Sequence, residues 1–171
     1  DGSFGSSDIQ GPVGDDAKYQ TAEVFILDHI TIGESFSIFP GLRYTKVNVD
    51  VDKFKDPITK AQASLSESYS AFVGSLKLQY IPQTSNFYNF YAGVNQSFRS
   101  PNLSDLTRFD IAKSGELEIA STDLDPEKYL TFETGVKAKW EKVEAEISLY
   151  RTNIDDMIIR VPTGELDGTN V

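Results

Sequence analysis

The sequence predicts an all-β fold, an antiparallel meander of about six strands. Apolar and polar residues alternate with a period of two in six stretches, as they do in strands with one apolar and one polar face. The connections between these stretches alternate between short and long. No apolar run approaches the ~20 residues that a membrane-spanning helix needs.

The clearest strand covers Asn86–Phe98. One side carries Tyr88, Phe90, Ala92, Val94 and Phe98, and the other carries Asn89, Tyr91, Gly93, Asn95 and Ser97. Such a strand is apolar toward one environment and polar toward the other. Soluble sheets show the same alternation, so the surrounding segments decide which environment the apolar face meets.

The amino-terminal part of the chain predicts a loop and two strands. Residues 1–16 are rich in Gly, Ser and Asp and are expected to form a loop. Ala17–Ile32 alternates as a first strand, and Gly33–Glu34 supplies a tight turn. The second strand has an apolar face made by Phe36, Ile38, Pro40, Leu42 and Tyr44. Beyond it the apolar positions move to the other face, at Val47, Val49 and Val51, which indicates a β-bulge or a strand that has left a membrane.

The remaining strands follow in order. Lys53–Glu67 is polar and is expected to be a loop, and Ser68–Ile81 alternates as the third strand. Pro82–Ser85 is a short turn before the fourth strand, Asn86–Phe98. A long loop at 99–126 precedes a fifth strand, Glu127–Trp140. After a turn near Glu141 a sixth strand has Val143, Ala145, Ile147 and Leu149 on its apolar face.

The lengths of the connections place all long loops at one end of the meander. Short turns lie at 33–34, 82–85 and about 141, and long loops lie at 53–67, 99–126 and after Arg160. Barrels of the bacterial outer membrane have short turns on one rim and long loops on the other. Aromatic residues near strand ends suit the girdles at the two membrane interfaces: Tyr44, Tyr80, Tyr88, Tyr129 and Trp140. Six strands cannot close a single-chain barrel, so we predict a partial transmembrane β-barrel that belongs to a larger one.

Several motifs, in order along the chain, resemble one protein family. They are GPVGDDAKY (11–19), PGLRY (40–44), FRSPNLSDL (98–106), LDPE (124–127), ETGVK (133–137) and LYRTNIDDMI (149–158). The chain is similar to the barrel region of a TonB-dependent outer-membrane receptor. The positions that carry the resemblance, with an expected structural role, are Phe98, Arg99, Pro101, Asn102, Leu103, Leu124, Pro126, Glu127, Glu133, Gly135 and Lys137.

The resemblance implies a place and an activity. It implies a bacterial outer-membrane barrel of about 22 strands, here residues 1–171, with the plug domain and the segment that engages the TonB complex outside this sequence. Neither end looks like the end of a complete barrel protein, so we expect a fragment. The implied activity is TonB-dependent uptake of a scarce nutrient, with an iron chelate (siderophore or haem) expected. The implied partners are outer-membrane lipid, a small-molecule ligand such as a metal chelate, and TonB.

Composition argues against several other functions. Lys plus Arg is 16 and Asp plus Glu is 26, and this net charge of −10 makes nucleic-acid binding improbable. The chain has no cysteine and one histidine, His29, for which we expect a structural role in the barrel wall. Asp50–Asp52 and Asp123–Asp125 lack the rest of a calcium loop. We therefore expect no metal, no cofactor and no catalytic residues, and we do not expect an enzyme.

Charged side chains on the polar faces have a structural explanation. Glu23, Glu133, Glu144 and Glu146 would point into the lumen beside Arg43, Lys77, Lys137 and Lys139, where a polar wall needs paired charges. Pro101 is expected to end a strand at the membrane exit. Arg99 would then lie at the level of the lipid head groups and meet lipid phosphates, a role we favour over ligand contact. The weak candidates for ligand binding in the outer loop are Arg99, Arg108 and Asp110.

Two alternatives remain open from the sequence. A soluble, secreted β-sandwich or adhesion-type binding module would explain the alternation and the missing cysteines, but not the one-sided loops or the ordered motifs. A smaller barrel such as a porin would lack the plug.

Overall fold

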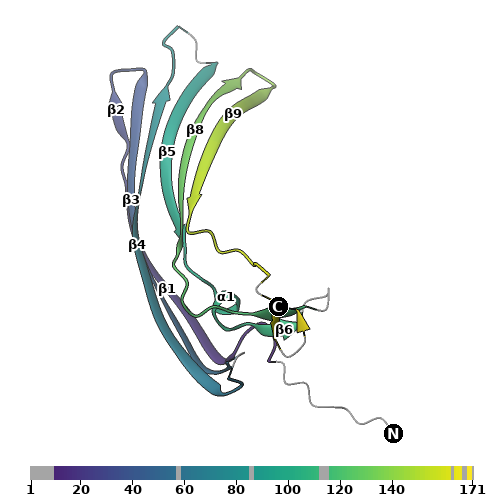
Figure 1. Cartoon of the computed structure of the whole chain (residues 1–171). Helices are drawn as coiled ribbons and strands as arrows, with labels where there is room; N and C mark the ends of the chain where they lie inside the picture. The colour runs from purple at the N-terminus through teal and green to yellow at the C-terminus, as the bar shows by residue number, and fades with distance from the viewer. Residues whose placement is uncertain are drawn as a thin grey trace.

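One curved antiparallel sheet dominates the molecule (Figure 1). The computed structural model describes residues 10–56, 59–84, 87–111, 116–162, 164–166 and 169–170. The strands run in the order β1-β3-β4-β5-β8-β9, and the short β2 pairs with β3. The predicted antiparallel meander is confirmed. Within the described residues the sheet does not close, and β1 and β9 form its two edges.

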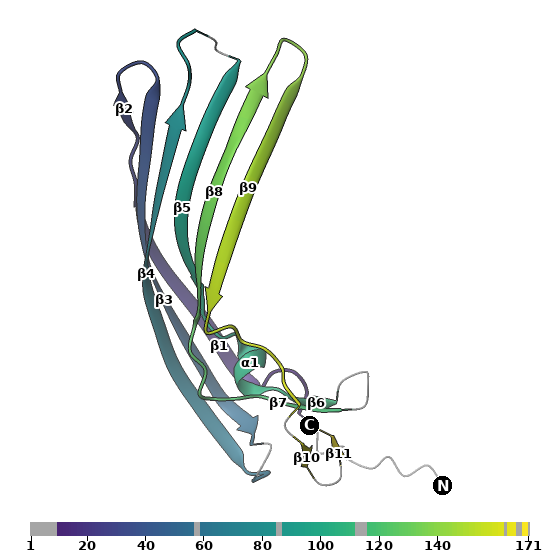
Figure 2. The same cartoon turned by 45° about the horizontal axis from the view of Figure 1, so that its top comes forward.

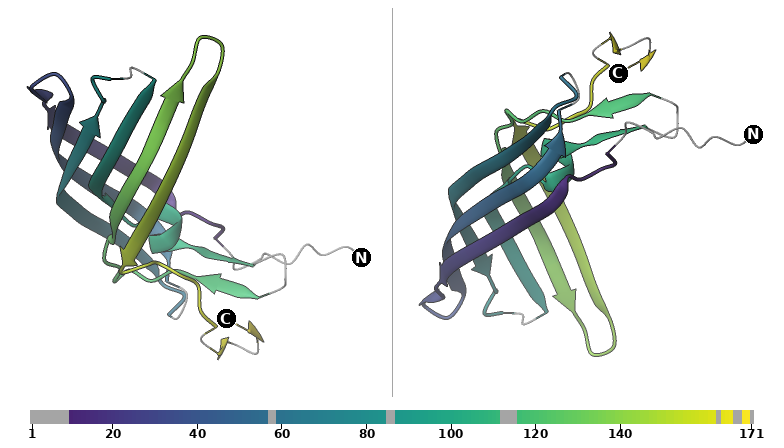
Figure 3. Two further views of the ribbon diagram at one scale, coloured as in Figure 1. Left: turned by 90° about the horizontal axis from the view of Figure 1, so that it is seen from above. Right: turned by 90° about the horizontal axis from the view of Figure 1, so that it is seen from below.

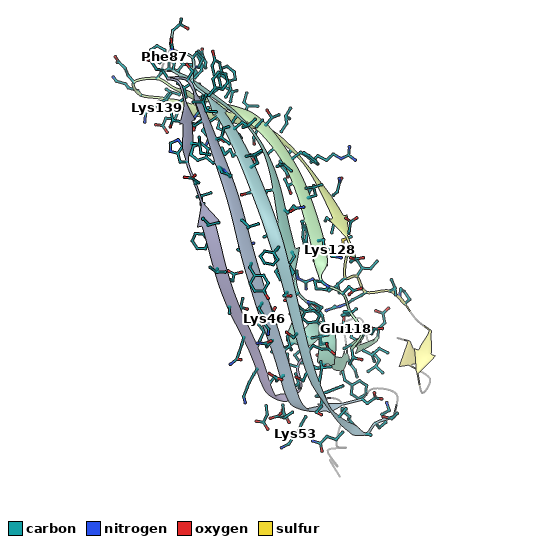
Figure 4. All side chains as sticks on the ribbon, turned by 90° about the vertical axis from the view of Figure 1, so that its left-hand side faces the viewer. Lys46, Lys53, Phe87, Glu118, Lys128 and Lys139 are labelled. Carbon is teal, nitrogen blue, oxygen red and sulfur yellow. The ribbon has the colours of Figure 1, made fainter. Side chains whose placement is uncertain are left out.

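All six predicted strands are present in the main sheet. Their bounds are β1 Asp15–Leu27, β2 Ile30–Ile32, β3 Phe36–Lys55, β4 Gln62–Tyr80, β5 Tyr88–Arg99, β8 Glu127–Lys139 and β9 Glu144–Asp155. The ends of the strands at the β2–β3, β4–β5 and β8–β9 connections lie together, at what is here called the turn end (Figure 1). Phe87 and Lys139 mark it, and Lys53 and Glu118 mark the opposite end, here called the loop end (Figure 4).

The first predicted strand is interrupted between β1 and β2 because of a proline on its neighbour. Leu27 pairs with Gly41, and Ile30 pairs with Ile38, so the register is the same on both sides of the break. Pro40 lies opposite Asp28 and accepts a hydrogen bond from its backbone N–H at 3.0 Å. A proline has no N–H to donate in return, so the ladder weakens at this point without a change of register.

The predicted loop at Lys53–Glu67 is wrong. β3 continues to Lys55 and β4 begins at Gln62, and a short turn joins them, in which Asp56 N–H donates to Ala61 O at 2.9 Å. From Tyr44 to Lys55 the strand rises roughly 36 Å at ~3.3 Å per residue. The connection at the loop end is therefore a tall hairpin, and it looked like a loop because its strands are polar there.

The change of apolar face after Tyr44 is not caused by a bulge. The pairing of β3 with β4 is regular from Phe36 to Val51, and the register shift comes later, between Val51 and Phe54. Val47, Val49 and Val51 are buried on the inner, concave face of the sheet, where α1 (Leu103–Thr107) covers them. The other explanation from the sequence, a strand that has left the membrane, fits. Beyond the apolar band the outward face is polar and the covered inner face is apolar.

The outward face carries an apolar band limited by aromatic pairs. Phe36 stacks on Tyr80 with ring centroids 4.6 Å apart, and Tyr44 packs on Phe72 at 4.7 Å. These two pairs are eight residues apart on each strand, about 26 Å at ~3.3 Å per residue, which matches the apolar band of outer-membrane barrels (~25 Å). Tyr88 and Trp140 extend the aromatic row at the turn end.

Tyr129 does not belong to the outward aromatic row. It lies on the same face of β8 as Glu127, and its hydroxyl donates a hydrogen bond to the Glu127 carboxylate. The sequence prediction that placed it in a girdle is wrong because Tyr129 is offset by one residue from the outward series that contains Leu130 and Phe132.

Between β5 and β8 the chain forms a small folded unit rather than a loop. It contains α1 and the two-stranded sheet of β6 (Phe109–Ile111) and β7 (Leu117–Ile119). Figure 2 shows this unit in the hollow of the main sheet at the loop end, and Figure 3 shows that it lies on one side of the sheet only. A further pair, β10 (Glu165–Leu166) and β11 (Thr169–Asn170), follows β9.

Candidate functional site

The segment between β5 and β8, residues 100–126, is the candidate functional site and is called the vestibule segment below. Long connections of outer-membrane barrels lie outside the cell, so the loop end is the external end. The vestibule segment covers the inner face there. A solute that enters the barrel from outside would meet this segment.

A small apolar core fixes the vestibule segment to the wall. Leu106 of α1 is fully buried against Val47, Val49 and Val51 of β3. Phe98, Leu103 and Leu124 pack around this cluster, which explains the apolar positions of the motifs FRSPNLSDL and LDPE. Burying each such side chain stabilises the arrangement by roughly 1.5–3 kcal/mol.

Phe98 reaches the inner core because β5 separates from β4. The pairing between these strands ends at Ser75 and Asn95, and the Gln96 side chain then accepts a hydrogen bond from Gly74 N–H at 3.2 Å. Beyond that point β5 continues toward α1. Phe98, the last apolar residue of the outward-facing series on β5, therefore packs on the inner side.

The motif residues Pro101 and Asn102 start the helix. Pro101 is fully buried at the end of β5. Asn102 is the N-cap of α1: its side chain accepts from Asp105 N–H at 2.9 Å, and the Asp105 carboxylate accepts from Asn102 N–H at 3.1 Å. This capping box stabilises a five-residue helix that would otherwise be too short to persist.

Arg99 joins the start and the end of the vestibule segment. Its guanidinium lies 2.7 Å from Asp105 Oδ2 and 3.1 Å from Glu127 Oε1. The predicted contact of Arg99 with lipid phosphates is wrong, because the side chain lies on the inner face and is paired there. The structural role that the sequence favoured for Arg99 fits this arrangement, with protein carboxylates in place of lipid.

Glu127 is the centre of this contact network. Its side chain is 5% exposed and forms an ion pair with Arg99. It also accepts hydrogen bonds from the hydroxyl of Tyr129 and from the backbone N–H of Ile158, the latter at 2.8 Å. The Tyr129 hydrogen bond holds the pKa of Glu127 below its ordinary value; burial opposes this, and Ile158 and Arg99 add to it. Glu127 therefore links three parts of the chain as a carboxylate.

A second carboxylate ties the vestibule segment to the chain after β9. Glu118 of β7 pairs with Arg108 Nη1 at 2.5 Å and with the guanidinium of Arg160. Arg108 also donates to Ser104 Oγ at 2.9 Å. Together with the bond from Ile158 to Glu127, this fixes residues 158–160 to the segment.

The chain before β1 is attached to the same unit. Gly11 and Phe109 form an isolated β-bridge, with N–H to O distances of 2.9 and 3.1 Å. Gly14 N–H donates to Thr107 Oγ1 at 3.1 Å, and Gln10 Nε2 donates to Thr107 O at 2.8 Å. One connected outer unit therefore contains residues 10–14, part of β3, the vestibule segment and residues 158–160.

The three candidate ligand-binding residues differ in whether their charged groups are already paired within the protein. Arg99 and Arg108 are both held in ion pairs within the protein. Asp110 lies in β6 and accepts a hydrogen bond from Ile111 N–H at 2.9 Å, and it pairs with no described cation. Of the three, only Arg108 lines a pocket of about 220 Å³, together with Phe54, Leu106 and Ile119.

The predicted pairing of charges on the inner wall is confirmed for two pairs. Lys137 Nζ lies 3.2 Å from Glu146 Oε2, and Lys139 pairs with Glu144 at 2.5 Å. Thr45 Oγ1 donates to Glu23 Oε1 at 2.8 Å. These carboxylates therefore have partners in the wall itself.

Tyr91 is the centre of the inner wall, and the sequence did not single it out. It is buried, Lys77 Nζ lies 4.8 Å from its ring centroid, and its hydroxyl donates to Glu146 at 2.8 Å and to Glu133 at 3.3 Å. A Cβ at Gly135 would lie 2.6 Å from this ring. The glycine of the motif ETGVK therefore makes room for Tyr91.

His29 lies at the other end of the wall. Its ring stacks on Phe39 with centroids 4.4 Å apart, and its Nε2 lies 3.1 Å from Ser37 Oγ. This position fits the expected structural role. Among the described residues no group of His, Asp or Glu is placed to hold a metal ion, and no helix among them is long and apolar enough to cross a membrane.

Comparisons with known proteins point to one family. A family profile described as "TonB dependent receptor-like, beta-barrel" matches residues 1–171. The chain is 33% identical over 116 residues to the vitamin B12 transporter BtuB of Vibrio vulnificus (strain YJ016), a match that covers 65% of this chain and 17% of that protein.

Two solved structures share the fold. A double mutant of the Serratia marcescens hemophore receptor HasR, in complex with its hemophore HasA and heme, has a TM-score of 0.65 at 16% identity, over 81% of this chain and 26% of that one. The copper transporter OprC has a TM-score of 0.70 at 20% identity, over 91% of this chain and 25% of that one.

The matched proteins are much longer than this chain, which spans 17% of the curated relative. Their names describe receptors and transporters, and the profile match over the full chain sets aside the soluble β-sandwich and the porin. The open sheet, the apolar band and the external vestibule segment agree with this result. The chain belongs to the TonB-dependent receptors and is part of the β-barrel of a bacterial outer-membrane protein.

Proposed function

We propose that this chain supplies wall strands and part of the outer vestibule of a receptor that takes up a scarce nutrient with energy relayed through TonB. The observation that carries the proposal is the vestibule segment. It is folded and fixed on the inner face at the external end, with Leu106 buried on β3 and Glu127 joined to three parts of the chain. A fixed surface at this place suits capture of a solute before its passage through the barrel.

The proposed ligand is an iron chelate, a siderophore or haem. The related proteins carry names that point to vitamin B12, to heme with a hemophore, and to copper, and all of these are metal-containing solutes. Our choice of iron rests on the resemblance described above. Arg99, Arg108 and Asp110 stay candidates for ligand contact, and Asp110 is the one without an ion pair among the described residues.

The plug and the contact with TonB would come from other parts of the receptor. The inner wall that would face a plug is polar and charged, with Lys77, Glu133 and Glu146 each in contact with Tyr91. Such a wall can form hydrogen bonds and ion pairs with a polar plug surface.

Uptake by cells that produce the whole receptor tests the proposal. Cells with and without TonB are given ferric siderophores, haem, cobalamin and copper in turn, and the metal accumulated is measured. We expect TonB-dependent accumulation of an iron chelate. Accumulation of cobalamin or copper alone would contradict the iron assignment, and equal accumulation without TonB would contradict the proposed mechanism.

A further inference from the structure

The outward face of the sheet carries a groove that crosses four strands. It has a volume of about 590 Å³, within the roughly 300–1,000 Å³ of small-molecule sites. Leu76, Val94, Phe132 and Leu149 line it, and the small side chain of Ala92 leaves it room. This groove faces away from the vestibule and lies in the apolar band, so lipid tails are what it meets.

A cation lies at the external end of the groove. Arg151 is part of the groove lining and follows Ile147 and Leu149 in the outward series of β9. In register it pairs with Phe132, in the row of Val94 and Leu76, and its long side chain can extend the charge toward the external interface. Arg151 forms a hydrogen bond to Asn153 Oδ1 at 3.3 Å and no ion pair with a described residue.

Two other outward cations, closer to the loop end, differ from Arg151. Lys128 of β8 is paired with Asp156 at 2.9 Å. Lys46 of β3 lies two residues beyond Tyr44 on the outward face (Figure 4) and does not line the groove. Within the described strands Arg151 alone combines an apolar groove with an outward cation that has no carboxylate partner.

We infer that this groove is a binding site for one anionic lipid of the outer leaflet, with an acyl chain along Ala92 and Val94 and a phosphate at Arg151. Bilayer tails are as apolar as leucine, so an apolar groove alone would not retain one lipid over another. Close packing of a chain in a shaped groove adds van der Waals contacts, and a cation at the interface attracts an anionic head group. The two together favour a phosphorylated lipid over an uncharged one.

The test uses the whole receptor, extracted from outer membranes in a mild detergent, and counts retained lipid by native mass spectrometry. Arg151→Gln removes the cation and Ala92→Phe fills the groove, and we expect each to lower the retained phosphorylated lipid about fivefold or more. Lys46→Gln is the control, since it removes one positive charge from the same face outside the groove. We expect it to retain lipid as the unchanged receptor does.

Three results would overturn the inference. Lipid retention that is unchanged by Arg151→Gln would exclude the phosphate contact. Retention lost equally in Lys46→Gln would mean that general surface charge, and no built site, holds the lipid. If Arg151→Gln loses the lipid and Ala92→Phe retains it fully, the lipid contacts Arg151 at the surface and does not occupy the groove. Heat-modifiable migration of each variant confirms that its barrel is folded.

Discussion

At the scale of single residues, the family motifs are explained by contacts between strands. Gly135 is a glycine because the ring of Tyr91 lies across it, and Glu127 is a carboxylate because Arg99, Tyr129 and Ile158 donate to it. Except for Tyr129, these partners are far apart in the sequence. A motif read along the chain shows the residue that is required and does not show its partner.

Replacing Gly135 with alanine should destabilise the barrel by about 1–3 kcal/mol, the usual cost of overpacking. The added Cβ would lie 2.6 Å from both the Tyr91 ring and Ile147 O. Gly74→Ala is the control, since its Cβ would have no atom closer than 3.6 Å. The denaturant midpoint of the refolded receptor measures the effect, and equal midpoints for the two variants would contradict the explanation.

The vestibule segment should loosen in acid through Glu127. The pKa of Glu127 is lowered in the folded protein, so the carboxylate contributes stability that is complete above its ordinary pKa of about 4.3 and is lost as the pH falls through the lower folded value. The protection of α1 against hydrogen exchange, corrected for the intrinsic pH dependence of amide exchange, should therefore fall between neutral pH and about pH 3.

The variant Glu127→Gln separates this effect from general acid unfolding. It should show low protection of α1 already at neutral pH, and this protection should depend less on pH. Asp123→Asn, which alters an exposed carboxylate of the same segment, should behave as the unchanged protein does. Identical pH profiles for Glu127→Gln and the unchanged protein would refute the role of this carboxylate.

At the scale of elements, the membrane band and the external hairpin are continuous strands in two different environments. β3 and β4 keep one register from Phe36 to Val51, while the apolar side chains change from the outward to the inner face after Tyr44. The change reflects what covers each face. Outside the band the outward face meets water and the inner face meets α1.

Cysteine labelling can locate the external limit of the apolar band on β4. The chain contains no cysteine, so single substitutions in this stretch can be distinguished. Ser66→Cys, on the external hairpin, should react with a membrane-impermeant thiol reagent added to whole cells. Leu78→Cys, on the outward face within the band, should react little. Rapid labelling of both positions would contradict the assigned membrane level.

The sequence predicted the strands in the band well and the external unit poorly, for physical reasons. A period of two is clear where one face meets lipid, as in Asn86–Phe98. It is weaker in 62–67, where the outward face is polar and only Ala63 and Leu65 mark the apolar inner face. A helix of five residues, α1, is too short to show a helical period. Arg99 was predicted at the right place in the chain but with the wrong partner, because Glu127 follows it by 28 positions.

At the scale of the whole molecule, the sheet is a section of a barrel wall. β1 and β9 each have one edge without a strand partner among the described residues. In lipid such an edge leaves backbone groups without hydrogen bonds at a cost of several kcal/mol each. The section therefore needs neighbouring strands on both sides.

Residues 1–171 expressed alone should not form a stable membrane barrel. We expect the isolated chain to aggregate without detergent, because its outward face exposes Phe72, Ile147 and Leu149 to water. Electrophoresis with and without heating is the measurement. A detergent-soluble monomer with heat-modifiable migration would show that the section closes or folds by itself, against this account.

The central claim is that the vestibule segment shapes the external ligand site, and ligand binding after its removal tests it most directly. Arg99 and Glu127 are paired neighbours, so a short turn can replace residues 100–126 in the whole receptor without breaking the β5–β8 ladder. We predict that this receptor still reaches the outer membrane with heat-modifiable migration and binds its ligand about tenfold or more weakly. Unchanged affinity in a correctly inserted receptor would contradict the account.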